Sequence, residues 1–142
     1  MQAEIVLSPI GRVHVTADGY RLEIDEAYRS ALMGLDGFSV VNVLWWAHLA
    51  DSEEARALRT CDQPYRNAPN ELGVFATRSP VRPNPIALTA APVLQIDVAR
   101  GTIDVAFIDA DEGTPILDIK PYHPAIDRVR DVAVPAWCAA WP

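Results

Sequence analysis

Hydrophobic and polar residues alternate along most of the chain in short runs bounded by turn residues, a pattern typical of β-strands. These runs predict strands over 4–16 (broken at Ser8-Pro9), 20–24, 74–77, 87–99 (two pieces with a bend at Pro92), 102–109 and after Pro115. The run over 38–50 is apolar on both parities, so we expect a central strand that is buried on both faces. Turn residues at 17–19 and 100–101 predict two hairpins.

Helical spacing is confined to two short segments. Asp25 is a candidate N-cap for a helix in which Tyr28, Leu32 and Leu35 share a face, and Ser52 is a candidate N-cap for a turn or two of helix over 53–59. The prolines and asparagines of 60–72 predict an irregular loop. The pattern therefore predicts one mainly β domain with a few short helices.

The stretch Gly73–Ile86 combines three prolines, two arginines and an asparagine. Proline fixes φ and removes a backbone donor, so we expect a stiff, extended loop after Thr77. In an extended loop Arg78, Arg82 and Asn84 tend to one side. Guanidinium groups held in advance suit a carboxylate or a phosphate. The alternative is that both arginines pair with acidic residues of the same fold.

The net charge of −7 argues against a surface covered in cations for nucleic acid, although a local basic patch is compatible with it. Cys61 and Cys138 lie far apart in the sequence, form no metal or redox motif and indicate free thiols in a reducing cytoplasm. The three histidines show no metal-ligand spacing. The sequence shows no signal peptide and no apolar run of about 18 residues, so we expect neither secretion nor a membrane helix.

A second motif lies at 109–122 and reads DADEGTPILDIKPY. Together with GVFATRSPVRPNPI at 73–86, Pro9-Ile10-Gly11 and LDGFS at 35–39, it resembles the TsaA-like (YaeB-like) family over nearly the whole chain. The resemblance implies a single β-barrel-like domain over 1–142. It also implies binding of S-adenosylmethionine, usually by a homodimer, and methylation of a modified adenosine beside the tRNA anticodon.

The resemblance also assigns candidate site residues. Those placed beside the cofactor are His48, Leu49, Arg78, Leu88, Ala106, Phe107, Ile108 and Asp109. Candidates for the loop and the substrate are Arg82, Asn84, Asp118, Lys120 and Tyr122. The catalytic residue is unassigned and no metal is expected. From the residues alone, His48 is a core histidine, and the i,i+2 pair of Asp118 and Lys120 is a surface ion pair.

The chain departs from the family pattern in ways that leave two functions open. The loop after Pro-Ile-Gly, which in the family reaches the cofactor, is reduced here to the turn at 17–19, and 60–72 holds one basic residue, Arg66. The chain is therefore either a methyltransferase or a module that binds S-adenosylmethionine without transfer. A transferase acting on a small molecule is a further alternative.

Tryptophan placement bears on assembly. Trp45 and Trp46 place one ring on each face of their strand, which suits one ring in the core and the other at a subunit interface or under an adenine. Trp137 and Trp141 predict that the tail over 125–142 docks on its own domain or on a partner subunit. We expect a homodimer.

Overall fold

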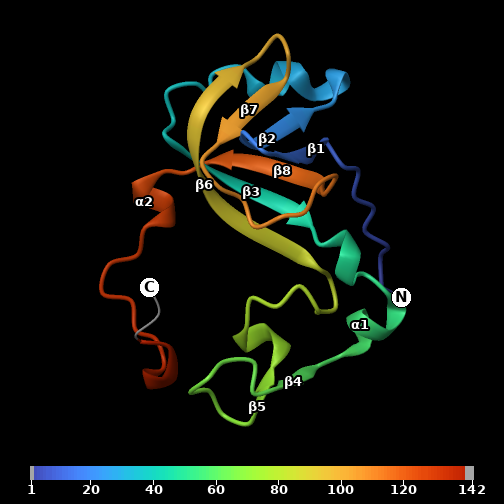
Figure 1. The fold of residues 1–142 in the computed structure, drawn as a ribbon, viewed down its shortest axis with the longest axis vertical. Helices are drawn as coiled ribbons and strands as arrows, with labels where there is room; N and C mark the ends of the chain where they lie inside the picture. The colour runs from blue at the N-terminus through green and yellow to red at the C-terminus, as the bar shows by residue number, and fades with distance from the viewer. Residues whose placement is uncertain (1, 140–142) are drawn as a thin grey trace. The chain divides into compact units, whose positions relative to one another are not determined.

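The protein is described by a computed structural model over residues 2–139, in which two compact units are recognised. The barrel unit comprises Met1–His48 and Ile86–Tyr122, and the loop unit comprises Leu49–Pro85 and His123–Pro142. A closed barrel with the strand order β1-β2-β7-β6-β3-β8 forms the first unit (Figure 1). Its strands are β1 (Gly11–Thr16), β2 (Gly19–Ile24), β3 (Val40–Trp46), β6 (Ile86–Asp97), β7 (Thr102–Val105) and β8 (Pro115–Pro121).

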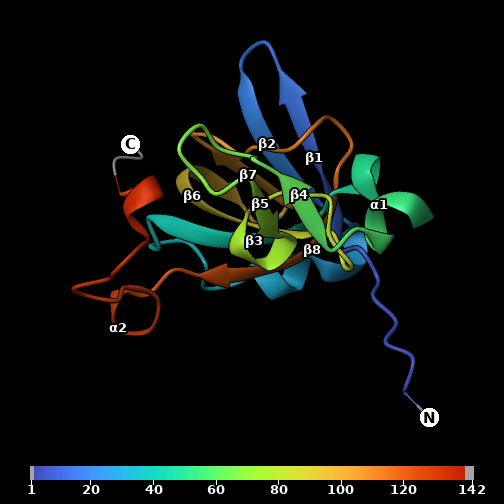
Figure 2. The same ribbon diagram turned by 90° about the horizontal axis from the view of Figure 1, so that it is seen from below.

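Two tight hairpins supply four of the six barrel strands, as the turn signals predict. β1 pairs with β2 from Gly11–Ile24 to Thr16–Gly19, and Figure 2 shows these two blue strands side by side. β6 pairs with β7 across a turn in which Gly101 adopts a φ of 70°, a conformation that glycine takes without steric cost. Both hairpins are confirmed.

The core lies inside the barrel because the inward parity of each strand is apolar. Val13, Leu22, Val43 and Ile103 are fully buried there. β3 pairs with β6 on one side and β8 on the other, so the prediction of a central strand is confirmed. Burial on both faces is not, because the outward side chains of β3 are only half-buried. Trp45 packs against the core and donates its ring N–H to the Thr89 hydroxyl at 3.0 Å.

A short helix, η1 (Glu26–Leu32), packs on the barrel through the buried side chain of Leu32. It is a 3-10 helix, and the Asp25 side chain makes no capping hydrogen bond. This part of the N-cap prediction is wrong, because the backbone carbonyl of Asp25 rather than its carboxylate accepts from Tyr28 N–H.

The loop unit contains only short secondary-structure elements among its described residues. They are η2 (His48–Ala50, which begins on the last barrel residue), α1 (Glu53–Ala57), β4 (Thr60–Asp62), β5 (Glu71–Gly73), η3 (Val74–Ala76), α2 (Pro124–Asp127) and η4 (Ala136–Cys138). Ser52 caps α1 by accepting from Ala55 N–H at 3.2 Å, as predicted. The prediction that the tail docks on its own chain is confirmed for Trp137, whose ring stacks on Tyr65 at 5.6 Å. Trp141 lies outside the described residues.

Five predicted elements are wrong in type or extent. The strand expected over 74–77 is the helical turn η3, and the expected loop over 60–72 contains the antiparallel pair β4–β5. Residues 2–10 form no strand. The segment 87–99 is one long strand rather than two, because Pro92 lies beside a register shift at 93–95 where its missing donor is tolerated. β7 ends at Val105, short of the predicted Asp109.

Gly11→Ala should destabilise the barrel severely. A Cβ on Gly11 would lie 2.1 Å from the backbone oxygen of Glu23 on the paired strand, and backbone atoms cannot yield as a flexible side chain can. We expect a loss of about 3 kcal/mol or more in the free energy of unfolding, measured by urea denaturation. Gly73→Ala is the control, because its Cβ would meet nothing closer than 3.9 Å at a φ of −65°. Equal stability of the two variants would contradict the close approach of β1 and β2.

Candidate functional site

Three predicted residues share the outward face of the barrel unit. Leu44 of β3 lies opposite both Leu88 of β6 and Asp118 of β8, and Lys120 is two residues further along β8. The Leu88 side chain is 45% exposed. Lys120 Nζ lies 2.9 Å from Asp118 Oδ2, and both side chains are solvent-exposed. This geometry supports a surface ion pair, which contributes little to stability.

Residues Ala106–Asp109 follow β7 as irregular backbone. Ala106 N–H donates to the carbonyl of Pro92 at 2.9 Å, which attaches the segment to β6. The Phe107 ring is half-exposed and meets Tyr20 edge-on at 5.4 Å. Ile108 is 1% exposed and belongs to the core, so only its backbone can reach a ligand. The Asp109 carboxylate is exposed and can accept from hydroxyl or ammonium groups.

Two further candidate residues, His48 and Tyr122, lie near opposite ends of β3. His48 is half-buried and begins η2 just after β3, and Leu49 after it is 73% exposed. Tyr122 lies at the other end, where its N–H donates to the carbonyl of Val40 at 3.0 Å. A strand rise of 3.3 Å per residue over the length of β3 places His48 and Tyr122 about 20 Å apart. The structure therefore does not bring them together.

In the loop unit, the segment after Thr77 contains neither helix nor strand, as predicted, but it is bent rather than straight. Ser79 N–H donates to the Thr77 hydroxyl and Val81 N–H donates to the Ser79 hydroxyl, which shapes two local turns. Arg82 folds back and donates from Nη1 to the carbonyls of Thr77 and Ser79, both at 3.1 Å. The prediction that Arg78, Arg82 and Asn84 tend to one side assumed an extended backbone, which these turns interrupt.

Arg78 and Asn84 flank this bent segment. Arg78 is exposed, and its backbone N–H donates to the Tyr65 hydroxyl at 3.4 Å. Asn84 is also exposed, and its side-chain oxygen accepts from Arg56 Nη2 at 3.3 Å. Arg56 Nε donates in addition to the carbonyl of Pro83 at 2.8 Å, so α1 and the proline-rich loop are tied together.

Among the acidic residues that were alternative partners for the two arginines, Glu112 is engaged by β1. Its Oε1 lies 2.8 Å from Nδ1 of His14, and its Oε2 accepts from the N–H of Val15. Nε2 of His14 lies 3.0 Å from the Glu23 carboxylate. The Val15 N–H, and then the His14 ring, lower the pKa of Glu112 below its ordinary value. Sequence spacing carries no signal for this cluster, because its members lie on three segments.

A polar hollow of about 710 Å³ opens on the outward face of β1, β2, β7 and β6. Arg21 and Asp104 line it as a bidentate pair, with Nε–Oδ1 at 2.7 Å and Nη2–Oδ2 at 3.2 Å. The hydrogen bond from Arg21 lowers the pKa of Asp104. Asp18 and Glu23 add negative charge to the lining, which also includes Ala106, so the hollow favours a cationic or mixed-charge ligand.

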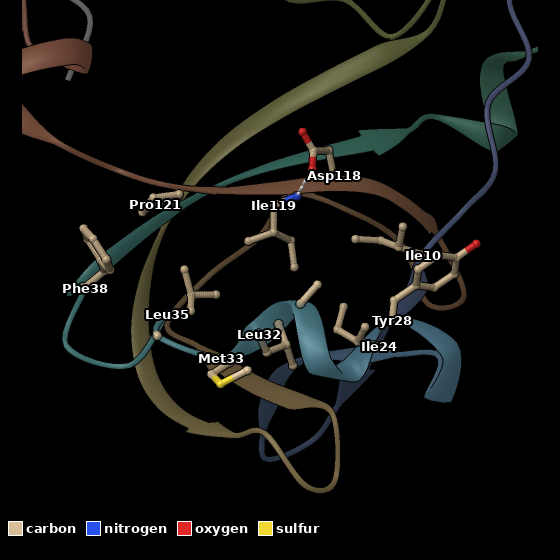
Figure 3. A pocket seen from close by; sticks show the side chains of 12 residues that line it. Ile10, Ile24, Tyr28, Leu32, Met33, Leu35, Phe38, Asp118, Ile119 and Pro121 are labelled. Atoms are coloured by element: carbon tan, nitrogen blue, oxygen red, sulfur yellow. Dashed lines mark hydrogen bonds between the residues drawn. The ribbon is translucent and has the colours of Figure 1, made fainter.

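A second hollow, of about 330 Å³, lies between η1 and β8 and is apolar (Figure 3). Leu32, Leu35 and Ile24 point into it from one side and Ile119 from the other. The Asp118 carboxylate points away on the opposite side of β8 and accepts from Ile119 N–H at 2.9 Å. This hollow holds no charged side chain for catalysis.

The part of the chain that the structure describes shows neither a metal cluster nor a membrane-spanning helix. Within 2–139, no group of three or more His, Cys, Asp and Glu side chains is arranged to hold a metal ion. None of the helices in that range has the length and apolar character needed to span a bilayer.

By its fold, this is a mainly β protein with a six-stranded closed barrel. A separate loop unit carries the arginine- and proline-rich segment. Residues 6–128 match the family model described as the tRNA-methyltransferase O N-terminal domain. The chain therefore belongs to that family. The expected family resemblance and the mainly β, barrel-like fold class are both confirmed.

Known relatives fall into two groups. A probable S-adenosyl-L-methionine-binding protein of Halobacterium salinarum is 39% identical over 100 residues, which cover 70% of this chain and 73% of that protein. The human tRNA (adenine(37)-N6)-methyltransferase is 41% identical over 105 residues, or 74% of this chain and 23% of that protein. The crystal structure of TrmO from Pseudomonas aeruginosa superimposes with a TM-score of 0.70 at 29% identity, and the match covers 92% of this chain. The chain spans 62% of that solved chain.

Replacing Glu112 with Gln should flatten the acid dependence of stability. A carboxyl pKa lowered by folding adds stability that is fully present above the ordinary value of 4.5 and is lost as the pH falls through the folded-state value. Glutamine carries no charge, so the free energy of unfolding of the variant should fall less between about pH 5 and pH 3. Urea denaturation at stepped pH measures this.

Glu4→Gln is the control, since Glu4 is exposed in the segment before β1 and should leave the pH dependence unchanged. An identical acid dependence in wild type and Glu112→Gln would show that the contacts of Glu112 with Val15 and His14 do not form in solution.

Proposed function

We propose that this protein is an S-adenosylmethionine-dependent methyltransferase acting on N6 of an adenosine in tRNA, beside the anticodon. The observation that carries this proposal is the family match over 6–128, which spans both the barrel strands and the arginine- and proline-rich loop. The human relative named a tRNA (adenine(37)-N6)-methyltransferase aligns over 74% of this chain, so the proposal concerns this shared part. The free thiols Cys61 and Cys138 support a reducing, cytoplasmic setting.

The barrel unit suits the cofactor in its charge. It carries twelve acidic and five basic residues, whereas the loop unit carries seven of each, so the whole net charge of −7 belongs to the barrel unit. S-adenosylmethionine has a sulfonium and an ammonium against one carboxylate and is a net cation. When bound, it supplies an electrophilic methyl group. Exposed Asp109 and the irregular backbone of 106–109 are groups that fit its ammonium or hydroxyls.

The contribution of the chain is then positioning and exclusion of water. Arg78 is exposed after η3, and its planar fork matches a carboxylate better than a lysine would. Half-exposed Phe107 and Leu88 offer apolar surface on which a ligand can be desolvated. Methyl transfer to a nitrogen needs alignment of donor and acceptor more than it needs a strong base, which agrees with the absence of a catalytic cluster in the sequence.

The second candidate function is binding of S-adenosylmethionine without transfer. The short turn between β1 and β2 favours it, because the family loop that reaches the cofactor is missing there. The Halobacterium salinarum relative is likewise named a binding protein. A transfer assay separates the two functions.

We also propose that two copies of the chain form a dimer through the outward ridge of β6. This ridge presents only apolar side chains, all exposed: Ile86, Leu88, Ala90, Pro92 and Leu94. Such a charge-free row is typical of the centre of a homodimer interface. A rise of 3.3 Å per residue separates the end of β6 near His48 from Pro92 by about 20 Å. In a dimer, one ligand could contact His48 and Leu49 of one copy and residues 106–109, which are attached at Pro92, of the other.

Light scattering at tens of micromolar should give about twice the chain mass of 15.6 kDa. Leu94→Glu should shift the protein towards the monomer, because a carboxylate within an apolar interface must be desolvated without a partner. Val132→Glu, at another exposed apolar position, is the control and should leave the mass unchanged. A monomeric wild type would contradict the dimer.

Purified protein with methyl-labelled S-adenosylmethionine should transfer label to tRNA, and digestion should place it on adenosine N6. Arg78→Ala should weaken cofactor binding about ten- to a hundredfold by calorimetry, since a hydrogen bond to a charged group contributes about 1.5–3 kcal/mol. Arg78→Lys should recover only part of this, because a point charge does not replace a bidentate fork.

Arg100→Ala is the control, because Arg100 lies in the β6–β7 turn beside Asp97. Binding of the cofactor without transfer to RNA would favour the second function. Wild-type affinity in a folded Arg78→Ala variant would remove Arg78 from the site.

A further inference from the structure

An aromatic ring on the loop unit is exposed at a position that the backbone holds firmly. Phe75 lies in the single helical turn η3 and is 77% exposed. Its neighbour Val74 is 2% exposed, and Thr77 is 6% exposed and donates its hydroxyl to the carbonyl of Val74 at 2.8 Å. Val74 and Thr77 therefore anchor the turn, and Phe75 is presented to solvent from a fixed support.

A cation is held over this ring in advance. Cζ of Arg82 lies 5.9 Å from the centroid of Phe75, within the range of a cation–π contact. The guanidinium of Arg82 is fixed there by the carbonyls of Thr77 and Ser79, which carry no formal charge to neutralise it. Ring and cation thus form a preorganised pair that loses little conformational freedom on binding.

The chemistry of this pair selects a nucleobase attached to phosphate. Aromatic rings and guanidinium planes are the groups on which unpaired bases stack, and arginine also attracts the phosphate backbone. The loop unit that presents the pair is neutral overall and all seven of its cations are arginine, in contrast to the acidic barrel unit. We propose that Phe75, with Arg82, is a stacking platform for an unpaired base of the RNA substrate; this rests on the proposed function.

Three variants at Phe75 test the platform with a fluorescently labelled anticodon stem-loop RNA and anisotropy as the readout. Phe75→Ala should weaken RNA binding roughly five- to a hundredfold, the range expected for loss of one stacked base. Phe75→Leu should be as weak as Phe75→Ala because it keeps an apolar side chain but has no π-face, whereas Phe75→Trp should bind at least as tightly as wild type. Ile126→Ala, at an 81% exposed apolar residue of the same unit, is the control and should bind as wild type.

Stacking also has a spectroscopic signature. 2-Aminopurine placed in the RNA loop should lose fluorescence on binding to wild type and Phe75→Trp, but not on binding to Phe75→Ala. Melting temperatures should be unchanged in all variants, since the ring is exposed. Wild-type RNA affinity in either Phe75→Ala or Phe75→Leu would overturn the platform.

Two further measurements test whether the Phe75 ring contacts the cofactor or a second copy of the chain instead of RNA. An equal loss of S-adenosylmethionine affinity in Phe75→Ala, measured by calorimetry, would assign the ring to the adenine of the cofactor and overturn the RNA platform. A fall in mass by light scattering would assign it to a second copy, with the same consequence.

Failure of the platform is distinguishable from failure of the proposed function. If wild type methylates RNA and Phe75→Ala does so with the same kcat/KM, only the platform fails. If wild type neither binds nor methylates RNA, both fail.

Discussion

Closure of the barrel between β1 and β8 is the constraint on which the rest of the barrel unit depends. The paired register covers only Gly11–Ile116 and Arg12–Pro115, and hydrogen bonds from Ile10 N–H to Ile116 and from Val13 N–H to Thr114 extend it. A closed barrel has no exposed edge for a foreign strand. Gly11 pairs with both neighbours of β1, and there the backbones of β1 and β2 approach too closely for a Cβ.

The same seam fixes the segment between β7 and β8. Gly113 N–H donates to the carbonyl of Val13, and Glu112 reaches the backbone of Val15, so this segment is bound to β1 at two points. Residues 106–109 lie at the start of the segment and are attached at Pro92 to β6. The candidate cofactor residues of the barrel unit therefore lie on backbone that is held at both ends, as a precise binding site requires.

Local chemistry was sufficient to predict the elements whose signals lie within a few residues. The turn at 17–19, the turn at Gly101 and the Ser52 cap were identified because each is specified by its own neighbours. The pair β4–β5 was missed because Cys61 and Leu72 meet across a long loop whose prolines hide the strands. Phe75 stands within a recognised motif, yet its exposure follows from η3, which the sequence pattern presented as a strand. No spacing links Tyr65 to Trp137 or His14 to Glu112, so these contacts required the structure.

Acidic and basic residues are divided unevenly between the two units. A net charge of −7 would oppose RNA if it were spread evenly, since the potential of a surface depends on nearby charges within about a Debye length of 8–10 Å. The acidic excess belongs to the barrel unit, where a cationic cofactor benefits from it, and the loop unit is neutral. The shortened β1–β2 turn belongs to the acidic barrel unit. Where the family carries a cofactor-reaching loop, this chain has a tight turn, and Asp18, Glu23 and Asp104 line a polar hollow beside it.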